Sequence, residues 1–378
     1  MRAKVLIFAG TRPEAIKMAP VVQALRRRKQ CFDVHLCATG QHREMLRQAF
    51  QDFGLRPDTD LEVMTRNQTL ASLSARLFMA VDALLADLAP DAVLVQGDTT
   101  TVQVAALCAF YRGIRLGHVE AGLRSHNLKL PFPEELNRRV TCLAADWHFA
   151  PTALAGNNLL REGVPPDRLL VTGNTVVDAL RWMAQQVRVE RPALPPSVEE
   201  ALAAGRRLVL VTGHRRENIG EPFQRICTAL LRLSRLFPEI LFVFPVHLNP
   251  RVRDTVQAIL GGVDGVCLID PLSYKPFVRL MDACELILSD SGGIQEEGAS
   301  LGKPVLIMRD VTERPEGVEA GINALVGTDE ARIVAETSRR LQAGRAVPDA
   351  PAANPYGDGR AAERIADFLT QVLDVAHV

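Results

Sequence analysis

Residues 91–98 read DAVLVQGD, a short apolar run followed at once by a glycine and an aspartate. The run is apolar on both alternating faces, which is typical of a strand that is buried on both sides of a parallel sheet. Similar runs recur along the whole chain, and each is bounded by turn-forming residues. They are KVLIFAG, DVHLCATG, DAVLVQGD, IRLGHVEAG, DWHFAPT and RLLVTGN in the first half and RLVLVTGH, ILFVFPVH, GVCLID, LILSDS, PVLIMRD and ALVGTD in the second.

Helical patterns lie between these runs, for example at residues 13–28, 69–88 and 223–237. Alternation of strand and helix predicts right-handed βαβ units and an α/β fold. The two series of runs predict two doubly wound Rossmann-like domains. We expect residues 1–172 to form the first domain and residues 173–359 the second, while a last helix at 360–378 either completes the second domain or packs back on the first.

Ligands of parallel α/β sheets bind at the carboxyl ends of the strands. With two such domains, the expected site is a central cleft that the two sets of strand ends face. The residues just after each strand are therefore the candidates for function.

The composition of the 378-residue chain narrows the classes of partner. It carries 44 basic and 44 acidic side chains, so it lacks the basic excess of nucleic-acid binders. Seven cysteines form no CxxC pair, which favours a reducing compartment and no structural zinc. No segment has the roughly 18–20 uninterrupted apolar residues of a membrane span. We expect a cytoplasmic protein without a membrane or nucleic-acid partner.

Polar residues crowd the predicted strand ends of the first half. Arg12 and Lys17 follow the first strand and could pair with a phosphate, although Gly10 and Pro13 alone are equally explained as a helix start. The loop contains neither GxGxxG nor GxxxxGK[ST], so no dinucleotide or P-loop site is indicated. Asp98 ends the third long run, where it could also be a simple helix N-cap.

Glu120 and Glu134 follow the next run, together with Arg138. Two glutamates at a helix start, such as Glu134 and Glu135, are often only a response to the helix dipole. Carboxylates crowded in a partly closed site, however, push one another's pKa values apart and so supply both a base and an acid.

In the second half, His214 and His247 each follow a strand, in positions more typical of ligand contacts than of a core. Tyr274 and Phe277 could stack on a base or form the apolar face of a helix. The stretch SDSGGIQEE at 289–297 places Ser291, Gly292 and Gly293 at a helix start. Free N–H groups there suit a diphosphate.

Glu297 lies one turn deeper than Gly293 on the same helix face. A carboxylate there would repel a phosphate, but it can accept hydrogen bonds from ribose hydroxyls. A nucleoside diphosphate fits both features of the stretch.

Taken in order, ten motifs resemble one family. They are GTRPEAIKMAP, QGDTTT, HVEAGLRS, PFPEELNRR, TGNTVVDAL, TGHRREN, PVHLNP, SDSGGIQEE, GKPVLIMRDVTERPE and NPYGDG, and they extend from near residue 8 to near residue 360. The set is similar to the bacterial non-hydrolysing UDP-N-acetylglucosamine 2-epimerases. The resemblance implies a glycosyltransferase-B-like fold, a homodimer, a role in cell-surface polysaccharide biosynthesis, and interconversion of UDP-GlcNAc and UDP-ManNAc without NAD, another cofactor or a metal.

The same resemblance implies roles for single residues. Asp98, Glu120 and Glu134 become the acid/base set for elimination of UDP to 2-acetamidoglucal and its re-addition, and His214 assists departure of the diphosphate. The implied UDP contacts are Arg12, Lys17, Arg138, Phe277, Ser291, Gly292, Gly293, Glu297 and Arg314.

An adjacent regulatory UDP-GlcNAc site is implied at Gln41, Gln68, Arg215 and His247. Glu44 and Asn67 depart from the glutamine and arginine expected there, and loss of that arginine would remove a phosphate partner. The motifs leave open relatives that act on UDP-diacetamido-glucuronate or UDP-N-acetyl-fucosamine, a hydrolysing epimerase, a glycosyltransferase of the same fold and a non-catalytic sensor.

Overall fold

The computed structural model describes residues 2–40, 43–65, 68–343 and 354–374 of the chain. Contacts within it divide the chain into two compact units. Unit 1 comprises residues 1–179 and 357–378, and unit 2 comprises residues 180–356. The sequence places the boundary near residue 172, whereas the division of contacts falls inside one continuous helix, α7 (Thr175–Glu190).

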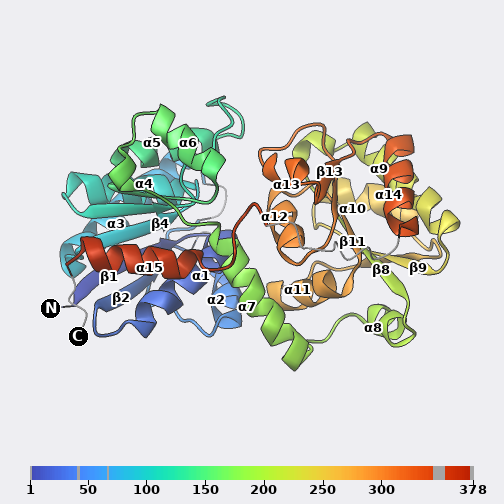
Figure 1. The fold of residues 1–378 in the computed structure, drawn as a ribbon, viewed down its shortest axis with the longest axis horizontal. Coiled ribbons are helices and arrows are strands. Elements are labelled where there is room, and N and C mark those ends of the chain that lie inside the picture. The colour runs from blue at the N-terminus through green and yellow to red at the C-terminus, as the bar shows by residue number, and fades with distance from the viewer. Residues whose placement is uncertain (1, 41–42, 66–67, 344–353, 375–378) are drawn as a thin grey trace. The chain divides into compact units, whose positions relative to one another are not determined.

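Unit 1 is built on a seven-stranded parallel sheet with the order β3-β2-β1-β4-β5-β6-β7 (Figure 1). Its strands are β1 (Ala3–Ala9), β2 (Phe32–Ala38), β3 (Thr59–Asp60), β4 (Ala92–Gln96), β5 (Arg115–Val119), β6 (Trp147–Ala150) and β7 (Leu169–Val171). Its helices, apart from the start of α7, are α1 (Arg12–Arg27), α2 (Arg43–Asp52), α3 (Leu70–Leu88), α4 (Thr100–Tyr111), α5 (Glu134–Ala144), α6 (Ala153–Arg161) and α15 (Ala361–Val372).

Unit 2 is built on a six-stranded parallel sheet with the order β10-β9-β8-β11-β12-β13. Its strands are β8 (Arg207–Thr212), β9 (Ile240–Pro245), β10 (Val266–Ile269), β11 (Leu286–Ser289), β12 (Val305–Ile307) and β13 (Asn323–Leu325). Its helices are α8 (Pro196–Ala203), α9 (Glu221–Leu236), α10 (Pro250–Leu260), α11 (Tyr274–Ala283), α12 (Gly292–Ser300), α13 (Glu316–Glu319) and α14 (Glu330–Gln342).

Both sheets have the doubly wound order that the sequence predicts, so the predicted α/β fold class is confirmed. The central strands are apolar on both faces because helices cover both faces. In β4, every residue from Ala92 to Gln96 is buried. The two-residue strand β3 escapes prediction because it is only half-buried and too short to show a pattern.

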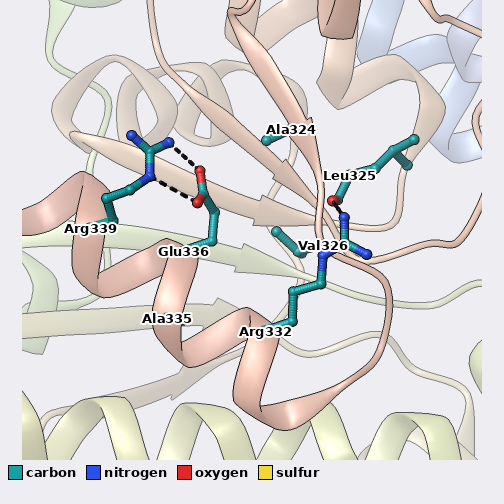
Figure 2. A pocket seen from close by; sticks show the side chains of 7 residues that line it. All are labelled: Ala324, Leu325, Val326, Arg332, Ala335, Glu336 and Arg339. Carbon is teal, nitrogen blue, oxygen red and sulfur yellow. Dashed lines mark hydrogen bonds and ion pairs between the residues drawn. The ribbon is translucent and has the colours of Figure 1, made fainter.

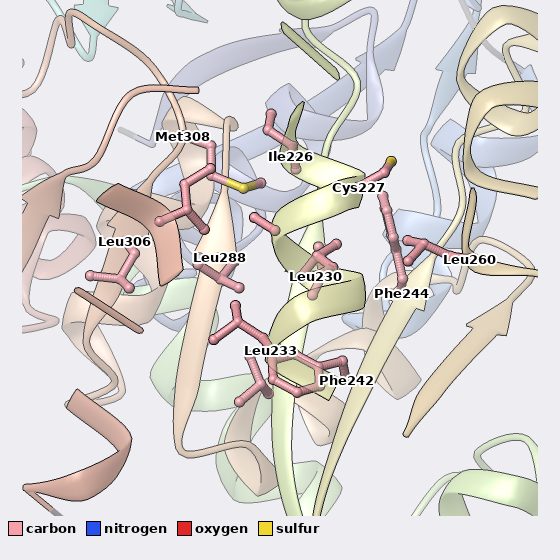
Figure 3. Close-up of a cluster of buried hydrophobic side chains, with 14 of the residues drawn as sticks. Ile226, Cys227, Leu230, Leu233, Phe242, Phe244, Leu260, Leu288, Leu306 and Met308 are labelled. Atoms are coloured by element: carbon pink, nitrogen blue, oxygen red, sulfur yellow. The ribbon is translucent and has the colours of Figure 1, made fainter. Parts of the chain in front are cut away.

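Apolar helix faces complete the cores. In α3 the side chains of Leu73, Leu77, Val81 and Leu85 recur every four residues and are buried against the sheet. In unit 2, helix α9 presents Ile226, Leu230 and Leu233 to Phe242 and Leu288 of the sheet (Figure 3). Each unit therefore has a core of its own.

The last helix, α15, packs beside α1 in unit 1 (Figure 1). Asp178 of α7 accepts hydrogen bonds from the backbone N–H groups of Ala361 (3.2 Å) and Ala362 (2.9 Å), and so satisfies two free donors at the start of α15. Arg28, the C-cap residue of α1, donates to Glu363 at 2.9 Å and to Asp367 at 2.5 Å. These contacts tie the C-terminal helix to the first unit.

Candidate functional site

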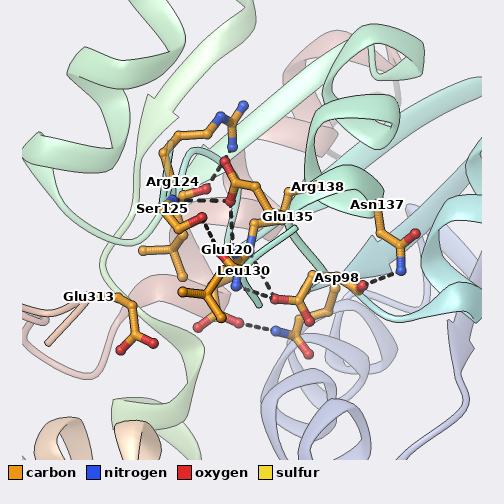
Figure 4. Close-up of polar contacts among 12 residues, drawn as sticks. Asp98, Glu120, Arg124, Ser125, Leu130, Glu135, Asn137, Arg138 and Glu313 are labelled. Carbon is orange, nitrogen blue, oxygen red and sulfur yellow. Dashed lines mark hydrogen bonds and ion pairs between the residues drawn. The ribbon is translucent and has the colours of Figure 1, made fainter. Parts of the chain in front are cut away.

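The strand order of unit 1 reverses between β1 and β4, and ligands of doubly wound sheets bind at such a reversal. Asp98 directly follows β4 at this point. Arg138 of α5 pairs with it, with Nη2 2.7 Å from Oδ2, and Asn137 donates to its backbone carbonyl at 2.8 Å (Figure 4). Burial raises the pKa of Asp98, and the positive charge of Arg138 opposes that shift. The structure thus brings the predicted residues Asp98 and Arg138 into direct contact.

The alternative interpretation of Asp98 as the N-cap of the next helix is wrong. Thr99 is the N-cap of α4, since its hydroxyl accepts a hydrogen bond from the backbone N–H of Val102. The carboxylate of Asp98 is turned toward Arg138 instead. Its position at the strand end is therefore not explained by helix capping.

Glu120 follows β5 and has a left-handed backbone with φ of 63°, a conformation that residues other than glycine seldom adopt. Side chains from other segments donate to both oxygens of its carboxylate. Lys17 of α1 lies 2.5 Å from Oε1, the amide of Asn174 donates to the same oxygen at 3.1 Å, and the amide of Gln96 donates to Oε2. The predicted residues Lys17 and Glu120 thus form an ion pair within unit 1.

Glu134 and Glu135 begin α5. Glu135 is fully buried and accepts from Arg138 at 2.8 Å and from the backbone N–H of Ser125 at 3.1 Å (Figure 4). Oε2 of Glu134 is also buried, and it has no hydrogen-bond partner among the described residues. Since Glu134 also acts electrostatically on Asp98, the predicted acid/base set is gathered around one strand reversal.

Glu14 is a further buried carboxylate at the same reversal. It accepts from the backbone N–H groups of Gly10 (2.7 Å) and Thr11 (2.6 Å) and from the hydroxyl of Thr99 (2.6 Å), so it links the loops after β1 and β4. Burial raises the pKa of Glu14 to about 7, while these hydrogen bonds oppose the shift. Arg12 and Pro13 open the helix that Thr11 caps, as expected from the sequence.

The strand order of unit 2 reverses between β8 and β11. Asp290, which follows β11, is fully buried and accepts from the backbone N–H groups of His214 at 3.0 Å and Arg215 at 2.9 Å. His214 stacks on His247, with ring centroids 5.4 Å apart. Burial lowers the pKa of His214, and the charge of Asp290 opposes that shift. The predicted residues His214, Arg215 and His247 therefore lie together.

Helix α12 begins at Gly292, with Ser291 as its N-cap residue, and the side chain of Ser291 makes no capping bond. A Cβ atom on Gly292 would lie 2.6 Å from Nη1 of Arg314 and 3.4 Å from Nη2 of Arg215, whereas one on Gly293 would meet nothing within 4 Å. Two guanidinium groups thus lie against a helix N-terminus with free N–H groups. This arrangement is suited to a phosphate group.

The remaining predicted contacts of unit 2 lie around the same helix. Arg314 donates to the buried Glu296 at 2.6 Å. Glu297 is buried and accepts from the hydroxyl of Tyr274 at 3.2 Å. Tyr274 is itself buried, so it does not offer an open ring for stacking, while Phe277 on α11 is only half-buried.

The predicted regulatory positions are partly described. Gln68 accepts hydrogen bonds from Arg76 and from the backbone N–H of Thr65, and His247 is exposed. Glu44 is exposed in the first turn of α2. Gln41 and Asn67 lie outside the described residues.

A pocket between β13 and α14 is a less suitable ligand site. Figure 2 shows that Arg339 pairs with Glu336 and that Arg332 donates to the carbonyl of Leu325, at 2.7 Å. These charges are already satisfied by the protein. In the described parts of the chain, no group of three or more His, Cys, Asp or Glu side chains is arranged to hold a metal ion. No helix among the described residues is both long and apolar enough to cross a membrane.

Comparison with known proteins decides the family. A model of the family "UDP-N-acetylglucosamine 2-epimerase" matches residues 23–370. The chain belongs to the UDP-N-acetylglucosamine 2-epimerase family. It is 50% identical over 370 residues to the UDP-N-acetylglucosamine 2-epimerase of Yersinia pestis, covering 97% of this chain and 98% of that protein. The enzyme of Escherichia coli K12 is likewise 50% identical, over 373 residues, with coverage of 97% and 98%.

Solved structures of the epimerase family share the fold. The UDP-GlcNAc 2-epimerase of Neisseria meningitidis, bound to UDP-GlcNAc, has a TM-score of 0.87 and 45% identity, over 97% of this chain and 100% of that one. The epimerase of Methanocaldococcus jannaschii, in complex with UDP-GlcNAc and UDP, has a TM-score of 0.79 and 33% identity, over 97% and 99%. The family membership predicted from the ordered motifs is confirmed.

The sequence assigned no function to several residues that contact the predicted site residues. Gln96 and Asn174 belong to motifs that carry the resemblance, but an amide has no chemical signature that marks it as a partner of Glu120. Asp290 precedes Ser291 in the glycine-rich stretch, and only the fold shows that it orders the loop of His214. The available signal was membership of a family motif for Gln96 and Asn174, and position next to Ser291 for Asp290.

Proposed function

We propose that the protein catalyses reversible epimerisation at C2 of UDP-N-acetylglucosamine, giving UDP-N-acetylmannosamine, without releasing free sugar. The observation that carries this proposal is the group of carboxylates Asp98, Glu120 and Glu134 at the strand reversal of unit 1. A glycosyltransferase has no need of a base at C2, and a sensor has no need of an acid/base set.

The proposed reaction begins with removal of the C2 proton by a carboxylate of unit 1. The C–H electron pair forms the C1=C2 double bond of 2-acetamidoglucal as the C1–O bond breaks, and its electrons go to the diphosphate of UDP. In the reverse step, the diphosphate oxygen attacks C1 while an acid returns a proton to the opposite face of C2. General acid–base catalysis of this kind needs one ionised and one protonated group.

Unit 2 supplies the groups that we propose for UDP. The N-terminus of α12 and the guanidinium of Arg314 would bind the diphosphate, and Glu297 would accept hydrogen bonds from the ribose. His214, whose pKa is lowered by burial, would stay largely neutral at pH 7 and donate a hydrogen bond to the leaving diphosphate. Phe277 remains a proposed neighbour of the uracil.

Incubation with UDP-GlcNAc in D2O tests the proposal. We expect UDP-ManNAc to form with deuterium at C2, and the recovered UDP-GlcNAc to gain deuterium at C2 as well. Each turnover passes through an intermediate that has lost the C2 proton, so the proton that returns comes from the solvent. Absence of C2 exchange would overturn the proposal. Free N-acetylmannosamine accumulating in step with UDP would instead identify a hydrolysing enzyme. Faster exchange with UDP-N-acetyl-fucosamine or UDP-diacetamido-glucuronate would reassign the substrate.

We also propose a cytoplasmic homodimer. All seven cysteines are free and six are buried, as suits a reducing compartment. The adjacent helices α4 and α5 expose large apolar side chains, namely Phe110 (60%), Tyr111 (71%) and Leu143 (86%). Apolar exposure of this kind is typical of a surface that is covered by another chain. Sedimentation velocity should show a species of twice the mass of the chain, and Leu143→Glu should shift it toward the monomer.

A further inference from the structure

The carboxylate of Glu120 is fixed in place by neighbouring side chains. Its side chain is 6% exposed, and both carboxylate oxygens accept hydrogen bonds from side chains on other segments. Its left-handed backbone is a strained conformation for a residue with a side chain, so the surrounding contacts must maintain that geometry. Of the donors Lys17, Gln96 and Asn174, Lys17 is charged and the two amides are neutral.

The two neutral donors are amides with fixed orientations. Asn174 is 2% exposed, and its Oδ1 accepts the backbone N–H of Val176 at 3.1 Å, in the first turn of α7. Its Nδ2 must therefore face Glu120. Gln96 is also 2% exposed at the end of β4 and directs its Nε2 to the other oxygen of Glu120. Both amides can only donate to the carboxylate, and donors on both oxygens favour its charged form.

We propose that Gln96 and Asn174 are positioning residues, which hold Glu120 in its left-handed conformation and in its ionised form for proton transfer at C2. This inference rests on the proposed epimerase function. Neither amide needs to contact the substrate. Asn174 also caps the start of α7, so one side chain supports both the helix and the carboxylate.

Other titratable and charged groups around Glu120 also influence its ionisation. Lys17 faces it from α1, Asp98 from the end of β4 and the buried His118 from β5. Glu134 and Arg138 of α5 act in turn on Asp98. Burial lowers the pKa of His118 to about 3, so this histidine stays neutral across the working range. A substitution at Asn174 leaves all of these groups in place.

Asn174→Asp is the decisive variant. An aspartate oxygen can still accept the N–H of Val176 and cap α7, but the oxygen that faces Glu120 can no longer donate. We expect the limb of the pH–kcat profile that reports Glu120 to move to higher pH by about one unit, because the ionised form of Glu120 loses a donor and gains a negative neighbour. On the acidic side of that limb, kcat should be about tenfold below the wild-type value at the same pH, with little change in KM.

Three further variants complete the experiment. Asn157→Asp adds the same charge on the exposed face of α6 and should leave kcat and the profile unchanged. Asn174→Ser keeps a capping oxygen without adding charge, so it should show a smaller shift in the same direction. Gln96→Glu should reproduce the shift of Asn174→Asp from the other oxygen. A wild-type profile in both Asn174→Asp and Gln96→Glu would overturn the inference.

A titration independent of turnover separates this inference from the proposed function. Protein labelled with 13C at the glutamate carboxyl groups would be followed by NMR against pH, with Glu120→Gln identifying the Glu120 signal. We expect the titration midpoint of that signal to rise by about one pH unit in Asn174→Asp. An unchanged midpoint would refute the positioning role even if the enzyme is active, whereas a raised midpoint without C2 exchange would refute only the epimerase proposal.

Discussion

The strand reversals of the two units have the same topology and opposite chemistry. At the reversal of unit 1, the carboxylates of Asp98 and Glu120 are paired with Arg138 and Lys17. At the reversal of unit 2, a glycine lies at the start of α12 beside Arg314. The carboxylates of the first reversal can exchange protons, while the second reversal brings guanidinium groups to the N-terminus of α12, an arrangement that suits an anion.

This difference explains why one fold supports two parts of a proposed reaction. The doubly wound sheet determines only where the loops converge. In the proposed reaction, carboxylates at the strand ends of unit 1 transfer the protons, and a glycine at the first position of a helix in unit 2 makes room for phosphate. If the two reversals have these separate roles, substitutions at the reversal of unit 1 should lower turnover, and substitutions at the reversal of unit 2 should lower UDP affinity.

The largest effect is expected for Asp98→Asn. The amide keeps the shape of the carboxylate but cannot transfer the proton, so C2 exchange should fall by about 10³-fold. UDP should still bind, because the groups proposed for its diphosphate and ribose in unit 2 are unchanged. Exchange in D2O and calorimetry with UDP measure the two effects. Asp87→Asn, on the exposed face of α3, is the matched control. If Asp98→Asn lost UDP binding together with turnover, the proposed assignment of turnover to unit 1 and UDP binding to unit 2 would be wrong.

A smaller effect is expected for Glu14→Gln and appears in stability. Burial raises the pKa of Glu14 from 4.5 to about 7 in the folded protein, so the folded state binds more protons than the unfolded state between these values. This contribution to stability is present below pH 4.5 and is lost as pH rises through 7, at up to about 3 kcal/mol. Glutamine mimics the protonated form and should remove that loss.

Urea unfolding of the wild type and of Glu14→Gln between pH 5 and 8 would test whether the stabilising contribution of Glu14 is lost as pH rises. The variant should gain free energy of unfolding relative to the wild type as pH rises, while the exposed Glu200→Gln should follow the wild type. A constant difference between Glu14→Gln and the wild type across this range would show that Glu14 keeps an ordinary pKa.

The smallest effect is expected for Gly292→Ala. The new Cβ would lie 2.6 Å from Nη1 of Arg314, the mobile end of a long side chain, so the fold should tolerate it while the guanidinium moves away. We expect UDP affinity to fall about tenfold, as for the loss of one charged hydrogen bond. Gly293→Ala meets nothing within 4 Å and should bind UDP normally. Equal affinities in the two variants would weaken the case for Arg314.

The sequence predicted what depends on local pattern. Apolar runs such as residues 92–95 indicated buried parallel strands, and polar residues after them indicated the strand ends. The start of α12 at Gly292 was also expected, because Ser291 and two glycines are typical of a helix N-terminus. These features depend on neighbours in the sequence.

Contacts between distant segments could not be predicted. Asn174 lies 54 residues from Glu120, and nothing in its own sequence indicates which carboxylate its amide contacts. Asp98 was open to interpretation as a helix cap because capping depends on a backbone geometry that Thr99 adopts instead. The ion pair of Lys17 with Glu120 likewise requires the order of β1, β4 and β5 in the sheet.

The return of α15 to unit 1 has a consequence for synthesis of the chain. Unit 2 is formed by one uninterrupted stretch, residues 180–356, while unit 1 needs segments from both before and after that stretch. The ribosome synthesises α15 after all of unit 2, so α1 and the start of α7 lack this packing partner until unit 2 has been made. During that interval, the surface of unit 1 against which α15 later buries Ala362, Ile365 and Leu369 is uncovered. Chaperones can bind such a surface. Unit 2, although encoded later than most of unit 1, has all its residues available first.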